Sequence, residues 1–178
     1  MNRWTFQFFT PIFLFFLMLI DNHISQLLSG IFSDNLMPDA HLFLIVLMYS
    51  VLKHRLTYLM ILGIALGVIY DAYFLNVIGL AAAVIPLIAL FCYEIQAVIF
   101  ANRLTRLFTT VIVVFAFEVI LPLVEVAFGL VTFNFLHFIA SQLAPTLLLN
   151  ILLAFLLQWP LEALYGIQKT DEGYEIKN

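Results

Sequence analysis

Long uncharged apolar segments recur along the whole chain and constrain its fold more than any other feature. The first runs from Thr5 to Ile20 without a single Asp, Glu, Lys or Arg. Of the 178 residues, 65% are hydrophobic and 10% are charged, whereas soluble domains carry roughly 45–50% and about 25%. A water-soluble fold of this length could not bury so much apolar surface. The sequence therefore predicts an integral membrane protein.

Charged and turn-forming residues divide the apolar sequence into six candidate spans. A bilayer core about 30 Å thick requires about 20 helical residues. We expect an all-α bundle of six transmembrane helices, forming one membrane domain over residues 1–178. The spans lie near 5–25, 36–52, 56–75, 78–101, 107–130 and 139–163. The second is expected to start at Leu36, because Pro38 is tolerated in a first helical turn.

The first span is expected to remain uncleaved, because Asp21-Asn22-His23 follows it instead of a small-x-small cleavage pattern. Residues 24–32 either prolong this helix or lie in the membrane interface.

The basic residues test the number of spans. With six spans, every one falls at the N-terminus, in the second or fourth loop, or at the C-terminus: Arg3, Lys53, Arg55, Arg103, Arg106, Lys169 and Lys177. The first, third and fifth loops contain none. The positive-inside rule then predicts that both termini are cytoplasmic.

Several function classes lack their signature residues. Seven basic against eleven acidic residues give no indication of a nucleic-acid partner. Cys92 is the single cysteine, so no disulfide framework or CxxC pair is possible within the chain. The four histidines form no HExxH or similar ligand set, and no Walker loop or GxSxG motif occurs. We therefore expect no catalytic residue, no cofactor, no metal site and no enzymatic activity.

A glycine stripe leads to a carboxylate in the third span. Gly63, Gly67 and Asp71 follow one another at four-residue intervals, which places them on one face of a helix. Glycines at this spacing let another helix approach closely. Asp71 is expected near the outer boundary, where it contacts water or accepts hydrogen bonds from the backbone of the next hairpin. The alternatives are an ion or substrate site and a contact for a partner protein.

Two further groups of polar and helix-bending residues occur in the fifth and sixth spans. Glu118, Pro122 and Glu125 share a stripe, and Pro122 leaves the carbonyl of residue 118 without its helical donor. The sixth span carries Pro145 and Asn150. Counting from the helix starts puts Glu118 and Asn150 both near mid-membrane, which predicts a hydrogen bond between them. Glu118 and Glu125 are about 10 Å apart along the helix, too far to share a proton.

In the order of these motifs the chain resembles the MreD family of bacterial rod shape-determining membrane proteins. The resemblance covers the outer segment Leu36-Met37-Pro38, the stripe Gly63, Gly67 and Asp71, the following Ile78-Gly79, and Pro145 to Asn150 with Pro160. The candidate helix-packing or partner-contact residues are Gly63, Gly67, Asp71, Gly79, Glu118, Pro122, Glu125, Pro145 and Asn150.

The resemblance implies a non-catalytic component of the machinery for side-wall peptidoglycan synthesis in the bacterial cell membrane. Its implied partners are the bitopic protein MreC, the MreB filament system, and a RodA-type polymerase with its transpeptidase. The family's fold is similar to that of substrate-binding subunits of energy-coupling-factor transporters. The alternative is therefore a small-molecule (vitamin-type) binding membrane subunit. Short outer loops argue against that alternative, and the mixed-charge tail Lys169–Asn178 is expected to be a short solvated end.

Overall fold

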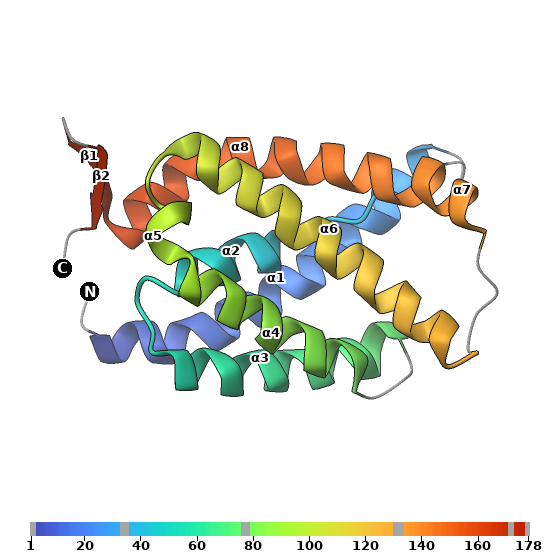
Figure 1. Cartoon of the computed structure of the whole chain (residues 1–178), viewed down its shortest axis with the longest axis horizontal. Coiled ribbons are helices and arrows are strands. Elements are labelled where there is room, and N and C mark those ends of the chain that lie inside the picture. Colours follow the sequence, from blue (N-terminus) through green and yellow to red (C-terminus); the bar gives the residue numbers. More distant parts are fainter. Residues whose placement is uncertain (1–2, 33–35, 76–78, 130–133, 171–172, 177–178) are drawn as a thin grey trace.

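The computed structural model describes residues 3–32, 36–75, 79–129, 134–170 and 173–176, most of them helical (Figure 1). The helices are α1 (Arg3–Ile31), α2 (Leu42–Ser50), α3 (Leu56–Tyr70), α4 (Leu80–Glu94), α5 (Gln96–Ile99), α6 (Arg103–Ala127), α7 (Phe135–Phe138) and α8 (Ala144–Tyr165). There are also two π-helical turns. The turn η1 (Asp71–Leu75) directly follows α3, and the turn η2 (Ile139–Leu143) directly precedes α8. Strands β1 (Ile167–Thr170) and β2 (Gly173–Ile176) pair antiparallel, with Lys169 opposite Tyr174.

The helices run between the two ends of a single bundle (Figure 1). One end, which we call the hairpin end, holds β1, β2, the start of α1, the α2–α3 connection and the start of α6. The other, the opposite end, holds η1, α7 and the ends of α1 and α6. The described basic residues all belong to segments at the hairpin end: Arg3, Lys53, Arg55, Arg103, Arg106 and Lys169. Lys177 lies outside the described residues.

The short helix α2 forms the centre of the bundle. All nine of its residues are buried, and it contacts α1, α4, α6 and α8. A helix that is apolar on every side is stable only when it is enclosed. At 1.5 Å per residue α2 is about 13 Å long, less than half of a bilayer core about 30 Å thick. The helix therefore begins partway through the bundle.

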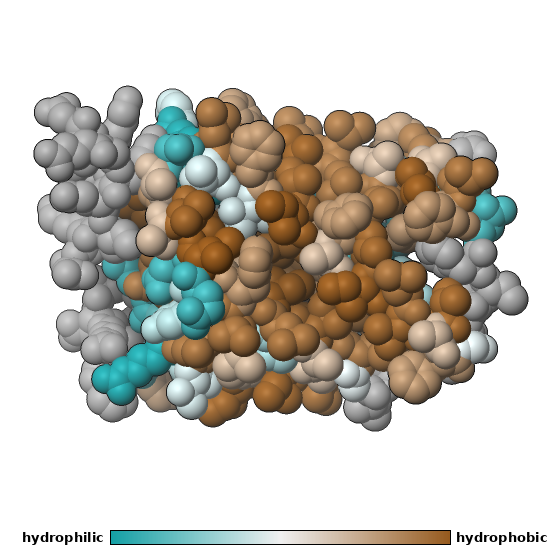
Figure 2. All heavy atoms as spheres, viewed as in Figure 1, coloured by the Kyte–Doolittle hydropathy of each residue, from teal (hydrophilic) through white to brown (hydrophobic). Residues whose placement is uncertain are grey.

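The outer surface of the bundle is apolar between its ends. Figure 2 shows hydrophobic side chains over most of the visible face, with hydrophilic ones gathered toward the hairpin end. On α1 the exposed side chains Phe8, Ile12 and Phe16 follow one another at four-residue spacing. The helices α6 and α8 expose similar rows, namely Leu104, Phe108 and Ile112, and Leu148, Leu152 and Phe155. Such a continuous apolar surface is typical of contact with lipid.

Four described helical segments are long and apolar enough to cross a membrane. They comprise residues 7–31, 56–75, 103–127 and 135–165, and α4 is a shorter apolar helix. The prediction of a multi-pass helical membrane protein agrees with this arrangement.

The start of α2 differs from the sequence prediction. Residues 36–41 are not helical, and α2 begins at Leu42 instead of Leu36. The backbone N–H groups of this segment bond instead to other parts of the chain; for example, Met37 N–H donates to the Ser141 carbonyl at 2.7 Å. Because these partners satisfy the backbone without a helix, Pro38 need not occupy a first turn. The predicted helix start was wrong for this reason.

Other segments differ less from their predicted ranges. The helix α1 continues to Ile31, so residues 24–31 prolong the first helix. The fourth span is interrupted at Ile95, where α4 ends and α5 begins. The helix α6 begins at Arg103, four residues before the predicted range. The chain after α8 forms the β1–β2 hairpin where only a short polar end was predicted.

Candidate functional site

The non-helical segment 36–41 is held by side chains from two helices, α1 and α8. Its Asp39 N–H donates to Thr146 Oγ1 at 2.9 Å, and its Ala40 N–H donates to Ser25 Oγ at 2.9 Å. Asn150 bonds this segment twice: its Oδ1 accepts from His41 N–H at 2.8 Å, and its Nδ2 donates to the Asp39 carbonyl at 2.7 Å. Irregular backbone at membrane depth is tolerated only where the protein itself satisfies it. These side chains meet that requirement.

Asp21 of α1 caps the N-terminus of α2. Its Oδ1 accepts from Leu42 N–H at 2.8 Å and its Oδ2 accepts from Phe43 N–H at 3.0 Å. The first N–H groups of a helix have no partner within the helix, and a carboxylate also complements the positive end of the helix dipole. Asp21 is buried, so its carboxylate accepts the hydrogen bonds that water would accept at an exposed helix end.

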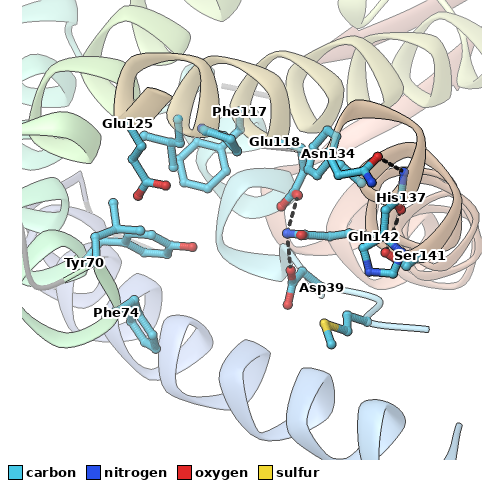
Figure 3. A pocket seen from close by; sticks show the side chains of 15 residues that line it. Asp39, Tyr70, Phe74, Phe117, Glu118, Glu125, Asn134, His137, Ser141 and Gln142 are labelled. Atoms are coloured by element: carbon cyan, nitrogen blue, oxygen red, sulfur yellow. Dashed lines mark hydrogen bonds between the residues drawn. The ribbon is translucent and has the colours of Figure 1, made fainter. Parts of the chain in front are cut away.

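A chain of polar side chains extends from His41 to Asp39. His41 Nε2 lies 2.6 Å from Glu118 Oε1. The amide Nε2 of Gln142 lies 3.2 Å from Glu118 Oε2 and 3.2 Å from Asp39 Oδ2 (Figure 3). Gln142 therefore bridges a carboxylate on α6 and a carboxylate on segment 36–41. The cluster joins three segments that are far apart in the sequence.

A cavity of about 530 Å³ adjoins this cluster at the opposite end (Figure 3). Its wall combines carboxylates and other polar groups with aromatic rings. Its lining residues include Asp39, Glu118, Glu125, Gln142, Tyr70 and Phe74. In the part of the chain that the structure describes, no group of three or more His, Cys, Asp or Glu could hold a metal ion.

The glycine stripe of α3 lies against α4. A Cβ added at Gly67 would lie 2.3 Å from the Ala82 Cα, and one at Gly63 would lie 3.0 Å from the Pro86 Cα. Real Cβ atoms do not approach backbone to 2.3 Å, so only glycine permits this crossing. Gly79, at φ 112°, is the N-cap of α4, and glycine adopts such positive φ values readily.

Asp71 caps the N-terminus of α4 from the end of α3. Its Oδ2 accepts from Gly79 N–H at 2.8 Å and Ala82 N–H at 3.1 Å, and its Oδ1 accepts from Ala81 N–H at 2.7 Å. The side chain is fully buried. The carboxylate thus bonds the backbone of the following hairpin, which is one of the two contacts that the sequence predicted for this residue.

Asn150 and Glu118 do not bond each other as the sequence predicted. Asn150 bonds the backbone of residues 39, 41 and 146, and Glu118 bonds His41 and Gln142. The two residues are linked through His41, whose N–H reaches Asn150 while its ring reaches Glu118. The prediction was wrong because the non-helical segment lies between the two helices.

The other predicted residues lie around the cavity or beside it. Pro122 and Glu125 line the cavity from α6. Pro145 stands in the first turn of α8, directly after η2. Proline is favoured there because an N-terminal residue needs no helical donor.

Sequence reasoning missed most of the polar cluster. It identified no role for Asp21, Asp39 or His41, and it did not consider Gln142. A charged residue within an apolar helix was the available signal for Asp21, because such residues usually face a bundle interior. Nothing in the local sequence indicated which helix N-terminus Asp21 would cap.

An ion-pair cluster at the hairpin end was also missed. The guanidinium of Arg103 bonds both carboxylate oxygens of Glu162, at 2.9 and 2.6 Å, and Arg106 bonds the same carboxylate. Asn102 and Thr105 cap the start of α6 reciprocally. Because Arg106 is 1% exposed, its charge depends on Glu162 for compensation. This cluster fixes the start of α6 against the end of α8.

Comparison with known proteins gives one family. The family model of rod shape-determining protein MreD matches residues 2–167. The cell shape-determining protein MreD of Streptococcus pneumoniae is 33% identical over 150 residues, which cover 84% of this chain and 91% of that protein. No solved structure matches the chain.

Proposed function

The chain belongs to the MreD family of rod shape-determining proteins, which makes it a cell shape-determining membrane protein, and we propose that it acts there as a non-catalytic scaffold. It would hold an MreC-like bitopic protein together with the side-wall peptidoglycan synthesis complex. The MreB filament system and a RodA-type polymerase with its transpeptidase are the other proposed partners.

One observation supports the scaffold role most directly: the buried polar residues hold backbone in place. Asp71, Asp21 and Asn150 each bond backbone groups outside their own helix. Such contacts stabilise one arrangement of the helices, because breaking any of them leaves buried polar groups unpaired. A scaffold requires a fixed surface of this kind, and the exposed apolar rows of α1, α6 and α8 offer such a surface within the bilayer.

The proposed topology has six crossings with both termini in the cytoplasm. In this arrangement α2 with segment 36–41 makes the second crossing, and α4 with α5 makes the fourth. The support is the gathering of the described basic residues at the hairpin end, which the positive-inside rule assigns to the cytoplasm. Reporter fusions after Lys53, Arg106 and Lys169 should then read cytoplasmic, and fusions near Asp34, Asn76 and Phe133 should read external.

The scaffold role is tested by purification and depletion. The chain, extracted from membranes in mild detergent, should carry MreC with it, and cells depleted of the chain should become round or wide. Single cysteines at Phe8, Phe108 and Leu152, in a Cys92→Ala background, would show by cross-linking which exposed apolar row contacts the partner. A chain that purifies without MreC, and whose loss leaves cell shape unchanged, would contradict the proposal.

The cavity of about 530 Å³ favours a second candidate, a vitamin-type binding subunit of an energy-coupling-factor-like transporter. This volume lies within the usual range of small-molecule sites, about 300–1,000 Å³. That role predicts co-purification with ATPase subunits and specific uptake of a vitamin. Uptake without MreC association would place this candidate first.

A further inference from the structure

The wall of the large cavity carries carboxylates without basic partners of the lysine or arginine type. Asp39, Glu118 and Glu125 line it, whereas no Lys or Arg is among the described residues of its wall. The described Lys and Arg residues belong to segments at the hairpin end instead. Glu118 is the buried one of the three, and a buried carboxylate is stabilised by a positive group nearby. Among the described residues of this site, the remaining basic side chains are two histidines, His137 in the wall and His41 behind Glu118.

Two of these carboxylates converge on one point. The Gln142 amide nitrogen lies 3.2 Å from an oxygen of Asp39 and 3.2 Å from an oxygen of Glu118. A neutral amide therefore occupies a position between two acids at long hydrogen-bond distances. An ammonium has three N–H donors and a guanidinium has five, and both form shorter and stronger bonds to carboxylates.

Glu125 adds a carboxylate that the described residues do not engage. Its side chain makes no hydrogen bond or ion pair with any described residue, and Figure 3 shows it on the cavity wall, directed toward Tyr70. Tyr70, Phe74 and Phe117 supply aromatic rings to the same wall. Aromatic faces attract cations within about 6 Å.

A buried ring nitrogen beside the cavity also lacks a partner. His41 is 2% exposed, and its Nδ1 has no hydrogen-bond partner among the described residues. The ring lines a smaller cavity of about 60 Å³, whose wall shares Asp39, Tyr70 and Phe74 with the large one. Buried nitrogens are almost always hydrogen-bonded in folded proteins. The polar cluster is therefore not completed by the described side chains.

We propose that the large cavity binds an organic cation through its primary ammonium or guanidinium group. Asp39, Glu118 and Glu125 would hold the charge, and the ring of Tyr70 would cover it. The cation is either a free small molecule or a lysine side chain of a partner protein. The site is distinct from the scaffold surface, because its residues face the cavity and not the lipid.

Agmatine, which carries a guanidinium at one end and an ammonium at the other, tests the free-molecule source. It should raise the thermal unfolding midpoint of the purified chain in detergent in a concentration-dependent way, since a ligand of the folded state stabilises it. The neutral 1,5-pentanediol should not. Glu125→Gln should weaken agmatine binding about tenfold, as expected for the loss of a charged hydrogen bond. Because Glu125 makes no bond in the structure, this variant should still fold.

Glu94→Gln is the matched control, because Glu94 at the end of α4 lines neither cavity. A zero-length carbodiimide reaction on native membranes tests the partner source, because it joins a carboxylate to an amine in contact with it. A cross-link that requires Glu125 but not Glu94 would support a partner-borne lysine even if free agmatine does not bind. Equal agmatine shifts in wild type and Glu125→Gln, or an equal shift with pentanediol, would overturn the proposal. The absence of both binding and a Glu125-dependent cross-link would overturn it as well.

Discussion

The two aspartate caps of this bundle satisfy the same requirement in different surroundings. Asp71 binds three N–H groups at the start of α4, eight to eleven residues further along the chain. Asp21 binds two N–H groups at the start of α2, twenty-one and twenty-two residues away. Both carboxylates replace water at a helix N-terminus inside the bundle.

The two caps differ in how closely the surrounding helices pack. The Asp71 cap belongs to a tight helical pair in which Gly67 meets the backbone of Ala82. The Asp21 cap lies beside segment 36–41, whose partners on α6 and α8 are up to 111 residues away, and Asp21 itself lines the smaller cavity. The comparison indicates that α3 and α4 form a closely packed pair on their own, whereas the start of α2 depends on the assembly of several helices.

The largest expected effect comes from removing a cap. Asp71→Leu would leave three buried N–H groups unpaired and should lower the free energy of unfolding by about 4 kcal/mol. Asp21→Leu, with two such groups, should lower it by about 2–3 kcal/mol. Asp71→Asn keeps one acceptor oxygen and should cost about half as much as Asp71→Leu. Denaturant unfolding in detergent, together with the abundance of each variant in the membrane, measures the order of destabilisation among these variants. Equal stability of Asp71→Leu and wild type would refute the capping role.

A glycine series tests the density of the α3–α4 pair. Gly67→Ala places a methyl group 2.3 Å from backbone and should cost about 2–3 kcal/mol, because the helices must separate. Gly63→Ala meets Pro86 at 3.0 Å and should cost about 1 kcal/mol. Gly30→Ala on α1 has open space and should be neutral or stabilising by up to about 1 kcal/mol. If all three variants had the same stability, the close crossing would not limit the packing.

A pH titration probes a histidine at the hairpin end. Burial lowers the pKa of His54 from 6.5 to about 4. Below about pH 6.5 His54 is therefore protonated in the unfolded chain but stays neutral in the folded chain, which favours the unfolded state. The contribution of His54 is complete above about pH 6.5 and is lost as the pH falls toward 4, by about 1 kcal/mol between pH 7 and 5.5.

The variant His54→Gln isolates this contribution. It keeps a side chain that can bond Thr10, the present partner of His54 Nε2 at 2.8 Å, and should reduce the pH dependence of unfolding by about 1 kcal/mol over the same interval. An unchanged slope in His54→Gln would contradict the assignment.

The smallest effect is a coupling energy between residues that share one cap. Asn150→Ala and Asp21→Asn both act at the start of α2, on neighbouring backbone groups of His41 and Leu42. Their combined cost should deviate from additivity by about 0.5–1 kcal/mol. Asn150→Ala with Asp71→Asn should add within about 0.5 kcal/mol, since they share no partner. Coupling of the same size in both pairs would remove the distinction between the two caps.

The sequence predicted the helical membrane class because composition and the length of apolar runs determine it. It indicated the surroundings of Asp71 because Gly63, Gly67 and the next hairpin are close in the chain. Its family resemblance to MreD is confirmed by the family match.

The polar cluster could not be predicted in the same way. Glu118 and Asn150 were each expected at mid-membrane, but His41 lies between them, 77 and 109 residues away respectively. The start of α2 was misplaced because tertiary partners, rather than helical hydrogen bonds, satisfy segment 36–41. Local patterns identify which residues are costly to leave in lipid, whereas the fold decides which of them meet.

The burial of α2 on every side has a consequence for biogenesis. A nine-residue helix is too short to enter the bilayer as an independent span, and its neighbours include helices made before and after it. The helix α8, the last of them to leave the ribosome, completes its enclosure. Membrane insertion of this chain should therefore proceed in two phases: the long helices integrate in turn during translation, and α2 reaches its final depth only after synthesis has passed residue 165.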